Sequence, residues 1–402
     1  MHLKGGKDLK KVSIRKSLVN LAEIMAATAA GSILKFVKPK RYKDVWMILE
    51  RGTDARDNGY FFFKWLRENH PEQNAVYVID PLSADAQKVK DIGRTVPFMS
   101  WKHKIIASIC TATISTHHNI NSPYENHYKW ADRLSSKHSK RVMLQHGVTK
   151  DDIPYFHYDW LNADLFICSA KPEYEFVKKT FGYPEGNVQY TGFARFDNLL
   201  KEHPANKWIL LMPTWRKYVV ENGVEGFKES LYYKKYQSLL NNNKLIFALR
   251  QHGYKLVFYP HYEIQRFLDE FSTEGEDVVK IAAFRDCDVQ ELLMRSELLI
   301  TDYSSIYFDF AYMGKPLLYY QFDEKEYRSG HYSAGYFNYR RDGFGPVLSD
   351  EESIMNGITA YLDDHHMYDA YQERVQNFFP VRDENNCERI YDAICKIAKS
   401  KT

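Results

Sequence analysis

Short apolar runs alternate with longer amphipathic stretches from residue 44 onward. In the first half the runs span 45–49, 75–80, 112–116, 141–147 and 165–169, and in the second half 208–214, 255–261, 278–281, 298–302 and 316–321. Turn residues bound each run, and the stretches between them have helical spacing. This alternation predicts βα units with mostly parallel sheets, and therefore an α/β fold.

A polar junction at 201–207 separates the two sets of runs. We expect two doubly wound, Rossmann-like domains that face a cleft and span 44–200 and 201–402. The last helix could pack back on the first of these domains. The segment 328–346 is expected to be a long loop. Ligands of such sheets bind beyond the carboxyl ends of the strands, so candidate chemistry is sought there.

Residues 1–43 form a third segment, in which 17–37 reads as one helix that ends before Pro39. Polar side chains gather on one broad side of its helical wheel, although Ile24 blurs the separation. Glu23 near the middle disfavours a membrane span. We expect a basic amphipathic helix that docks on an anionic membrane surface; a helix packed on the domain and a true span are the alternatives.

The composition supports a folded protein with a substantial core, because 44% of the 402 residues are hydrophobic and 27% are charged. The net charge of +3 gives no reason to expect a nucleic-acid partner. Residues 1–43 hold eleven Lys and Arg against two acidic residues, so the basic character belongs to that segment. Five scattered cysteines without a CxxC pair favour a reduced, cytosolic compartment.

The run 298–302 ends in Asp302. Tyr303, Ser304 and Ser305 come next, and then a helical pattern resumes. Backbone N–H groups at a helix start and two hydroxyls can receive phosphate oxygens. The alternative is that one of the serines only caps the helix. Because the turn lies at the carboxyl end of a strand, we favour a phosphate site.

Each half also delivers a histidine at a strand end, His146 in the first and His261 in the second. Gly147 beside the first of these would let a ligand approach closely. A single histidine is more often structural, but one per half at equivalent places favours a site. Arg216 follows Thr214 at another strand end and suits charge-assisted pairing with phosphate; a surface ion pair is the alternative.

Other motifs have simpler explanations. Asp286 and Asp288 form an Asp-x-Asp pattern, but Asp288 with Glu291 has the spacing of a capping box. The histidine-containing cluster at 116–119 lacks metal-ligand spacing. Walker and GxGxxG sequences are absent from the chain. We therefore expect neither a metal nor a cofactor.

Five segments resemble the CDP-glycerol:polyglycerophosphate glycerophosphotransferases of bacterial teichoic acid synthesis. They are QHG, GFARFD, MPTWR, YPH and TDYSSIYFDFAYMGKP, at 145–147, 192–197, 212–216, 259–261 and 301–316. The resemblance covers roughly residues 140–345 and implies a two-domain architecture of the GT-B type. It also implies a peripheral protein on the cytoplasmic face of the cell membrane, which moves an alditol phosphate from a CDP carrier to an undecaprenyl-diphosphate-linked acceptor.

The resemblance further assigns roles to individual residues. His146 matches the catalytic base and His261 the histidine that contacts the donor phosphate. The remaining residues expected to bind substrate are Thr214, Arg216, Asp302, Ser304, Ser305, Gly147 and Arg328. The donor is expected to be CDP-glycerol, with CDP-ribitol as the alternative.

The expected reaction is attack by an acceptor hydroxyl on the β-phosphorus of the CDP-alditol, which yields a phosphodiester and CMP. His146 would take the hydroxyl proton, and His261, Arg216 and the turn after Asp302 would stabilise phosphate charge. A glycosyltransferase that uses a nucleotide-sugar is the alternative among enzymes. A membrane-bound scaffold that binds nucleotide without turnover is the alternative of another class.

Overall fold

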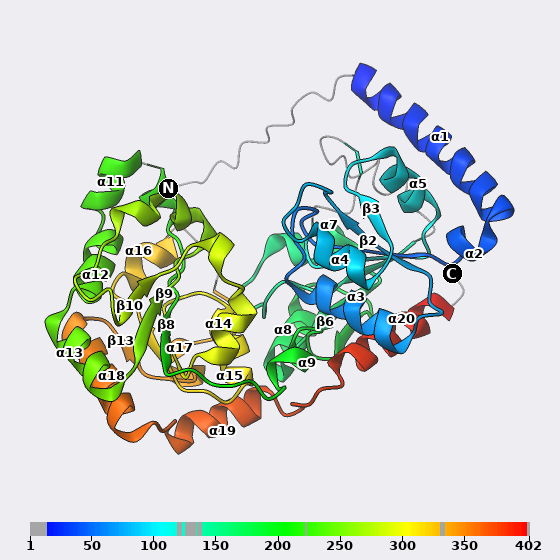
Figure 1. Cartoon of the computed structure of the whole chain (residues 1–402). Helices are drawn as coiled ribbons and strands as arrows, with labels where there is room; N and C mark the ends of the chain where they lie inside the picture. Colours follow the sequence, from blue (N-terminus) through cyan, green and yellow to red (C-terminus); the bar gives the residue numbers. More distant parts are fainter. Residues whose placement is uncertain are drawn as a thin grey trace.

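The computed structural model describes residues 14–118, 123–124, 134, 139–221, 223–329 and 334–399. In this part of the chain the strands form two wholly parallel sheets, one in each of two lobes (Figure 1). The order is β3-β2-β1-β4-β5-β6-β7 in the N-terminal lobe and β10-β9-β8-β11-β12-β13 in the C-terminal lobe. The chain reverses its winding between β1 and β4 and again between β8 and β11. The predicted α/β fold with two parallel sheets is confirmed.

The N-terminal lobe alternates strands with helices. Its strands are β1 (Trp46–Leu49), β2 (Ala75–Ile79), β3 (Thr95–Pro97), β4 (Ala112–Ser115), β5 (Lys140–Met143), β6 (Leu165–Cys168) and β7 (Val188–Tyr190). Its helices are α3 (Asn58–Asn69), α4 (Ala86–Ile92), α5 (Trp101–Ile109), the short 3₁₀ helix η1 (Pro154–Phe156), α7 (Tyr158–Leu161), α8 (Lys171–Thr180) and α9 (Phe196–Leu199).

The C-terminal lobe repeats this alternation. Its strands are β8 (Trp208–Leu211), β9 (Lys255–Phe258), β10 (Val279–Ile281), β11 (Leu298–Thr301), β12 (Leu317–Tyr320) and β13 (Val347–Leu348). Its helices are α10 (Lys217–Val220), α11 (Gly223–Glu229), α12 (Leu231–Leu240), α13 (Asn243–His252), η2 (Tyr262–Glu270), η3 (Phe284–Asp286), α14 (Val289–Arg295), α15 (Ile306–Tyr312), α16 (Glu324–Ser329), α17 (Tyr339–Asp342), α18 (Glu351–Asp364) and α19 (Asp369–Phe378). Within the segment expected to be a long loop, α17 is helical and residues 330–333 lie outside the described residues.

Each sheet is apolar on both faces because helices cover both of them. In β1 the side chains of Trp46 and Ile48 join one core cluster, and those of Met47 and Leu49 join another. The first cluster continues into the C-terminal lobe, where it includes Leu210 of β8. The two lobes therefore share one continuous apolar core.

The last helix, α20 (Asn386–Lys399), returns to the N-terminal lobe. It follows α19 across the molecule and packs beside α3, β5 and β6 (Figure 1). Ile390 and Ile394 are buried in the shared core, and the Tyr391 ring stacks on His70 with centroids 3.9 Å apart. The C-terminal end of the chain thus ties the lobes together.

The helix expected before the first domain is α1 (Ile14–Val37), followed by α2 (Pro39–Tyr42). It lies at the outer edge of the N-terminal lobe and packs against α5 (Figure 1). Ile24 faces inward and is buried, whereas Met25 is 65% exposed and Phe36 is 89% exposed. The basic residues before residue 14, which we expect to contribute to membrane docking, lie outside the described residues.

Glu23, the charged residue in the middle of α1, forms an ion pair within this packing. Its carboxylate lies 2.7 Å from Nζ of Lys104 in α5. The segment Leu18–Val37, with a mean hydropathy of 1.3, is the one described helix long and apolar enough to cross a membrane. The inward side of α1 is thus held by α5, while an apolar row remains in contact with solvent.

Candidate active site

His146 lies in the turn that follows β5. Gln145 before it adopts a left-handed backbone conformation, with φ of 59°. The buried Gln145 side chain donates to the Ile167 carbonyl at 2.5 Å and to Glu173 at 2.9 Å. These bonds turn the chain sharply, so that the His146 side chain is 57% exposed while its predecessor is fully buried.

Asp57 and Arg195 extend from His146 as a chain of charged contacts. His146 Nδ1 lies 3.0 Å from Asp57 Oδ2, and Arg195 donates to Asp57 Oδ1 at 2.9 Å. Arg195 also forms a two-pronged pair with Asp309 of α15, at 2.6 and 2.8 Å. Burial alone would raise the pKa of Asp57, but Arg195 and His146 lower that pKa to about 2. Asp57 is therefore an anion at neutral pH.

A second imidazole lies beside His146. The His117 ring, which follows β4, has its centroid 5.1 Å from that of His146. Its Nε2 accepts a hydrogen bond from Arg51 Nε at 3.2 Å. Burial, together with His146, lowers the pKa of His117 to about 3. His117 is therefore neutral beside the first histidine.

His261 approaches the same place from the C-terminal lobe. It follows β9, its Nδ1 accepts from the Glu263 backbone N–H at 3.2 Å, and its ring stacks on Trp215. Burial lowers the pKa of His261 to about 4, with further contributions from Arg51 and His146. Charges on Arg51 and His146, both in the N-terminal lobe, therefore act on His261.

Ser304 and Ser305 lie in the turn between β11 and α15 and are partly exposed. A Cβ atom placed on Gly147 would lie 2.8 Å from the Ser305 hydroxyl oxygen. Glycine is therefore needed where the His146 turn meets the serine turn. The structure thus brings the turn of His146 and Gly147 against Ser305, and places His146 within electrostatic reach of His261.

Arg216 and Asp302 differ from the expectation that they contact substrate. Arg216 is 0% exposed, and its guanidinium pairs with Asp302 at 3.0 Å and with Asp323 at 2.8 and 3.0 Å. The buried Asp302 carboxylate accepts from the Thr214 and Tyr303 backbone N–H groups at 2.9 and 2.5 Å. We correct the expectation accordingly: these two residues support the serine turn from the protein interior.

Thr214 and Arg328 also have contacts within the protein. The Thr214 carbonyl accepts from Arg216 at 2.7 Å, which adds to the same buried network. Arg328 pairs with Glu324 one turn earlier in α16, at 2.9 Å, and half of its side chain is exposed. The structure therefore gives Thr214 a supporting position and leaves Arg328 as part of a surface ion pair.

The Asp-x-Asp motif serves as a cap, as predicted. Asp288 precedes α14, and its carboxylate accepts from the Gln290 and Glu291 backbone N–H groups at 2.9 and 3.3 Å. Among the described residues no three His, Cys, Asp or Glu side chains are placed to hold a metal ion. Asn119, in the histidine-containing cluster, lies outside them.

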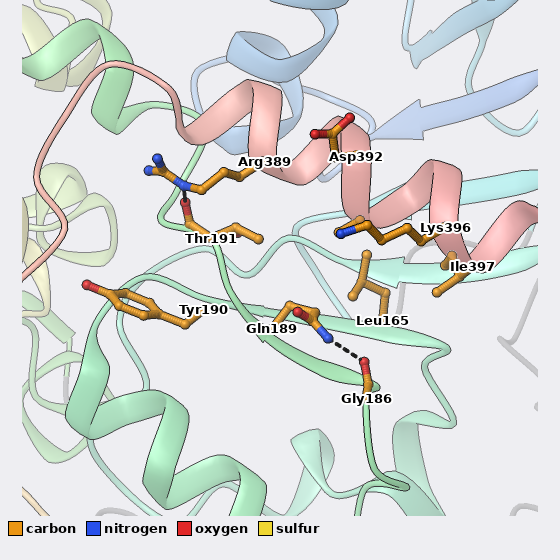
Figure 2. Close-up of a pocket in the computed structure, with 10 residues that line it drawn as sticks. Leu165, Gly186, Gln189, Tyr190, Thr191, Arg389, Asp392, Lys396 and Ile397 are labelled. Atoms are coloured by element: carbon orange, nitrogen blue, oxygen red, sulfur yellow. Dashed lines mark hydrogen bonds between the residues drawn. The ribbon is translucent and has the colours of Figure 1, made fainter.

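A pocket of about 340 Å³ lies elsewhere, between β7 and α20 (Figure 2). Its polar lining includes Thr191, Arg389, Asp392 and Lys396. Arg389 is already engaged, because it donates to the Thr191 carbonyl at 2.8 Å and to Asp383 at 2.9 Å. This pocket shares no residue with the histidine site.

The sequence analysis gave no role to Asp57, Arg195 or Asp309, and it considered His117 only within a cluster without metal-ligand spacing. Arg195 lies within the GFARFD segment, and Asp57 precedes a helix in a charged loop, but neither position identifies its partner. The contact between Asp57 and Arg195 joins residues 138 positions apart. Only the fold brings them together.

The chain is similar to known proteins of one family. Residues 32–396 match the family described as CDP-Glycerol:Poly(glycerophosphate) glycerophosphotransferase. The chain is 35% identical over 378 residues to the Minor teichoic acid biosynthesis protein GgaB of Bacillus subtilis (strain 168), covering 89% of this chain and 40% of that protein. It is 30% identical to the Teichoic acid poly(glycerol phosphate) polymerase of the same strain, covering 88% of this chain and 49% of the polymerase.

A solved structure shows the same fold. The Wall Teichoic Acid Polymerase TagF superposes with a TM-score of 0.67 and 19% identity, over 96% of this chain and 97% of the solved chain. The chain spans about half, or less, of the length of the two curated relatives above. Because the family match extends over most of the sequence, the chain belongs to the CDP-glycerol:poly(glycerophosphate) glycerophosphotransferase family.

Proposed function

We propose that the chain transfers glycerol phosphate from CDP-glycerol to a lipid-linked teichoic acid, or a related cell-surface polymer, and releases CMP. Family membership supports the reaction class. The observation that carries the proposal is the convergence of His146 and His261, one from each lobe, beside the serine turn. We further propose that the donor lies between the lobes in a GT-B type cleft.

His146 acts as the base in this proposal. Its Nδ1 faces the Asp57 carboxylate, so Nε2 remains free to accept a proton. An acceptor hydroxyl gives its proton to Nε2 as its oxygen attacks the β-phosphorus. The bond from this phosphorus to the bridging oxygen breaks, and CMP leaves with the bonding electrons. A positioned base of this kind contributes roughly 10²- to 10⁴-fold to the rate.

His261 and the serine turn bind the donor diphosphate. A neutral imidazole and two hydroxyls can each donate a hydrogen bond to phosphate oxygens. Arg216 and Asp302 support the turn through buried ion pairs, so that the serines are preorganised for the transferred group. We assign no metal and no cofactor to this reaction, and CDP-glycerol is a substrate.

We propose that α1 holds the enzyme at the membrane that carries its lipid-linked acceptor. The exposed apolar row, which includes Met25 and Phe36, suits insertion into the interfacial region of a bilayer. Exposed Lys38, Lys40 and Arg41 follow directly and suit anionic headgroups. We propose a peripheral location on the cytoplasmic face of the membrane, where an undecaprenyl-diphosphate-linked acceptor would be within reach.

The test is incubation with CDP-glycerol and CDP-ribitol in parallel, using a lipid-linked disaccharide acceptor and mass spectrometry of the product. The proposal predicts a phosphodiester-linked glycerol and CMP. A ribitol adduct alone would change the donor and keep the reaction class. A glycosidic product made from a nucleotide-sugar would contradict the proposal, and so would nucleotide binding without turnover.

A further inference from the structure

The Asp57 carboxylate is fixed by its own neighbourhood before it meets the histidine. Asp57 caps α3, with Oδ1 accepting from the Asn58 backbone N–H at 2.7 Å. Its backbone N–H donates to the buried Glu50 carboxyl group at 3.0 Å, and that of Tyr60 donates to the same group at 2.7 Å. The loop after β1 therefore presents Asp57 in one orientation.

The contact with His146 defines which nitrogen of the ring carries hydrogen. An ionised carboxylate can only accept, so the imidazole must donate from Nδ1 across the 3.0 Å contact. In the neutral ring Nε2 then holds the lone pair. Asn58 holds the backbone of the same turn, because its amide donates to the Gln145 carbonyl at 2.8 Å.

Arg195 connects this pair to the other lobe. It follows β7 in the N-terminal lobe, whereas its two-pronged partner Asp309 lies in α15, directly after the serine turn. Both side chains are almost completely buried. The Phe193 and Phe196 rings flank the guanidinium, with its carbon 4.9 and 5.5 Å from their centroids. Because the planar Arg195 guanidinium is held on several sides, the position of Asp309 influences that of Asp57.

We propose that Asp57 is a positioning residue that holds His146 in the Nδ1–H form, and that Arg195 with Asp309 fixes Asp57 when the lobes are docked. The inference rests on the proposed function for the role of His146 as a base. Its consequence is that the base becomes competent in the same arrangement that brings Ser305 against Gly147. Assembly of the donor site and orientation of the base are thereby coupled.

Other groups near His146 define what removal of the carboxylate would do. His117 from the end of β4, Arg51 from the loop after β1 and His261 from the C-terminal lobe surround it. With Asp57 changed to Asn, Arg51 and the two neighbouring imidazoles remain, while the carboxylate that accepts from Nδ1 of His146 is lost. Asn is as good a helix cap as Asp, so the substitution preserves the start of α3.

The direct test reads the imidazole nitrogens by ¹⁵N NMR in protein without substrate, with the His146 signals identified by their loss in His146→Gln. We expect the Nδ1–H form in the wild type. In Asp57→Asn we expect a smaller fraction in the Nδ1–H form, because an amide can donate to the ring nitrogen as well as accept from it. Asp309→Asn should reduce the fraction in the Nδ1–H form. Asp277→Asn is the control, because Asp277 forms an exposed two-pronged pair with Arg250 at 2.8 and 2.7 Å.

Kinetics on the same variants separate positioning from donor binding. Asp57→Asn should lower kcat for CMP release by roughly 10²- to 10⁴-fold, the range for loss of a base or its orienting carboxylate. The KM for donor should be nearly unchanged. If Asp309 acts through Asp57, the double variant should be no slower than Asp57→Asn alone.

Three results would overturn the inference: an Nε2–H form in the wild type, an unchanged fraction in the Nδ1–H form in Asp57→Asn, or additive losses in the double variant. The NMR measurement needs no donor. A wild type that has the Nδ1–H form but releases no CMP from CDP-glycerol would therefore refute the proposed function and leave the positioning by Asp57 standing.

Discussion

Arg216 and His146 both follow a parallel strand in a short polar segment, yet burial separates their roles. Arg216 has no exposed surface, and its donors are taken by Asp302, Asp323 and the Thr214 carbonyl. The His146 side chain is more than half exposed. Sequence motifs identified both residues, but only the packing around each one distinguishes a supporting residue from one that can meet substrate.

The Arg216 network gives a prediction about stability. Arg216→Met leaves two buried carboxylates without their partner, which should cost about 3–5 kcal/mol of unfolding free energy. Urea denaturation measures the loss. Arg250→Met is the control, because Arg250 pairs with Asp277 at the surface and its loss should cost much less. Equal losses in the two variants would contradict the structural role of Arg216.

Gly147 gives a prediction about activity. In Gly147→Ala the new methyl group would lie 2.8 Å from the Ser305 hydroxyl oxygen and 3.3 Å from its Cβ, so the hydroxyl must rotate away or the two turns must separate. We expect kcat/KM for donor to fall by roughly 10- to 100-fold, as small misplacements in a site do. Gly357→Ala is a matched control in α18, where the closest atom is the Leu348 Cδ1 atom at 3.1 Å. Equal activity of the two variants would argue against the contact.

His103 in α5 gives a pH prediction. The ring is fully buried, and burial lowers its pKa from an ordinary 6.5 to about 3. Below pH 6.5 the His103 ring therefore binds a proton in the unfolded chain but not in the folded chain. The free energy of unfolding falls as pH falls through this range. The slope from this group approaches about 1.4 kcal/mol per pH unit. Urea denaturation from pH 7 to pH 4 should show a shallower decline in His103→Gln, and parallel curves would refute the assignment.

At the scale of elements, strong apolar runs were easy to predict and weak edge strands were not. Each of the ten predicted runs overlaps a strand of the observed sheets. The sequence analysis missed β3, β7 and β13, which have two or three residues each and lie at sheet edges. Thr95 and Pro97 in β3 and Gln189 in β7 interrupt the apolar pattern. Such strands form because a neighbouring strand offers unpaired backbone groups.

The α1 helix gives the prediction at this scale. Its inward side packs on α5. Ile24 interrupts the predicted separation of polar and apolar side chains because it is buried, and the exposed row remains apolar. Met25→Glu/Phe36→Glu should lower binding to phosphatidylglycerol vesicles by tenfold or more, about what loss of two buried apolar side chains implies. Vesicle sedimentation measures it. Leu82→Glu is the control, since Leu82 is 93% exposed but lies outside this helix.

Phosphatidylcholine vesicles and added salt complete the membrane experiment. Binding should be weaker to the neutral vesicles and should fall as salt screens the lysines that follow α1. Unchanged binding of the α1 variant would mean that the helix serves only as a packed element of the N-terminal lobe.

At the scale of the whole molecule, the site exists only where the two lobes meet. The alternation of apolar runs predicted both sheets, and the strand-end rule located His146 and His261. The chain of contacts from His146 through Asp57 and Arg195 to Asp309 could not be predicted, because its members lie far apart in sequence and its last pair joins the two lobes. The single core that runs through both lobes fixes these distances.

The measurement that tests this account most directly is donor binding and CMP release by His146→Ala. Isothermal titration with CDP-glycerol should give a Kd close to that of the wild type, since His261 and the serine turn are untouched. CMP release in the presence of acceptor should fall by about 100-fold or more, as expected for loss of a general base. A variant that releases CMP at nearly the wild-type rate would contradict the central claim that His146 takes the proton of the acceptor.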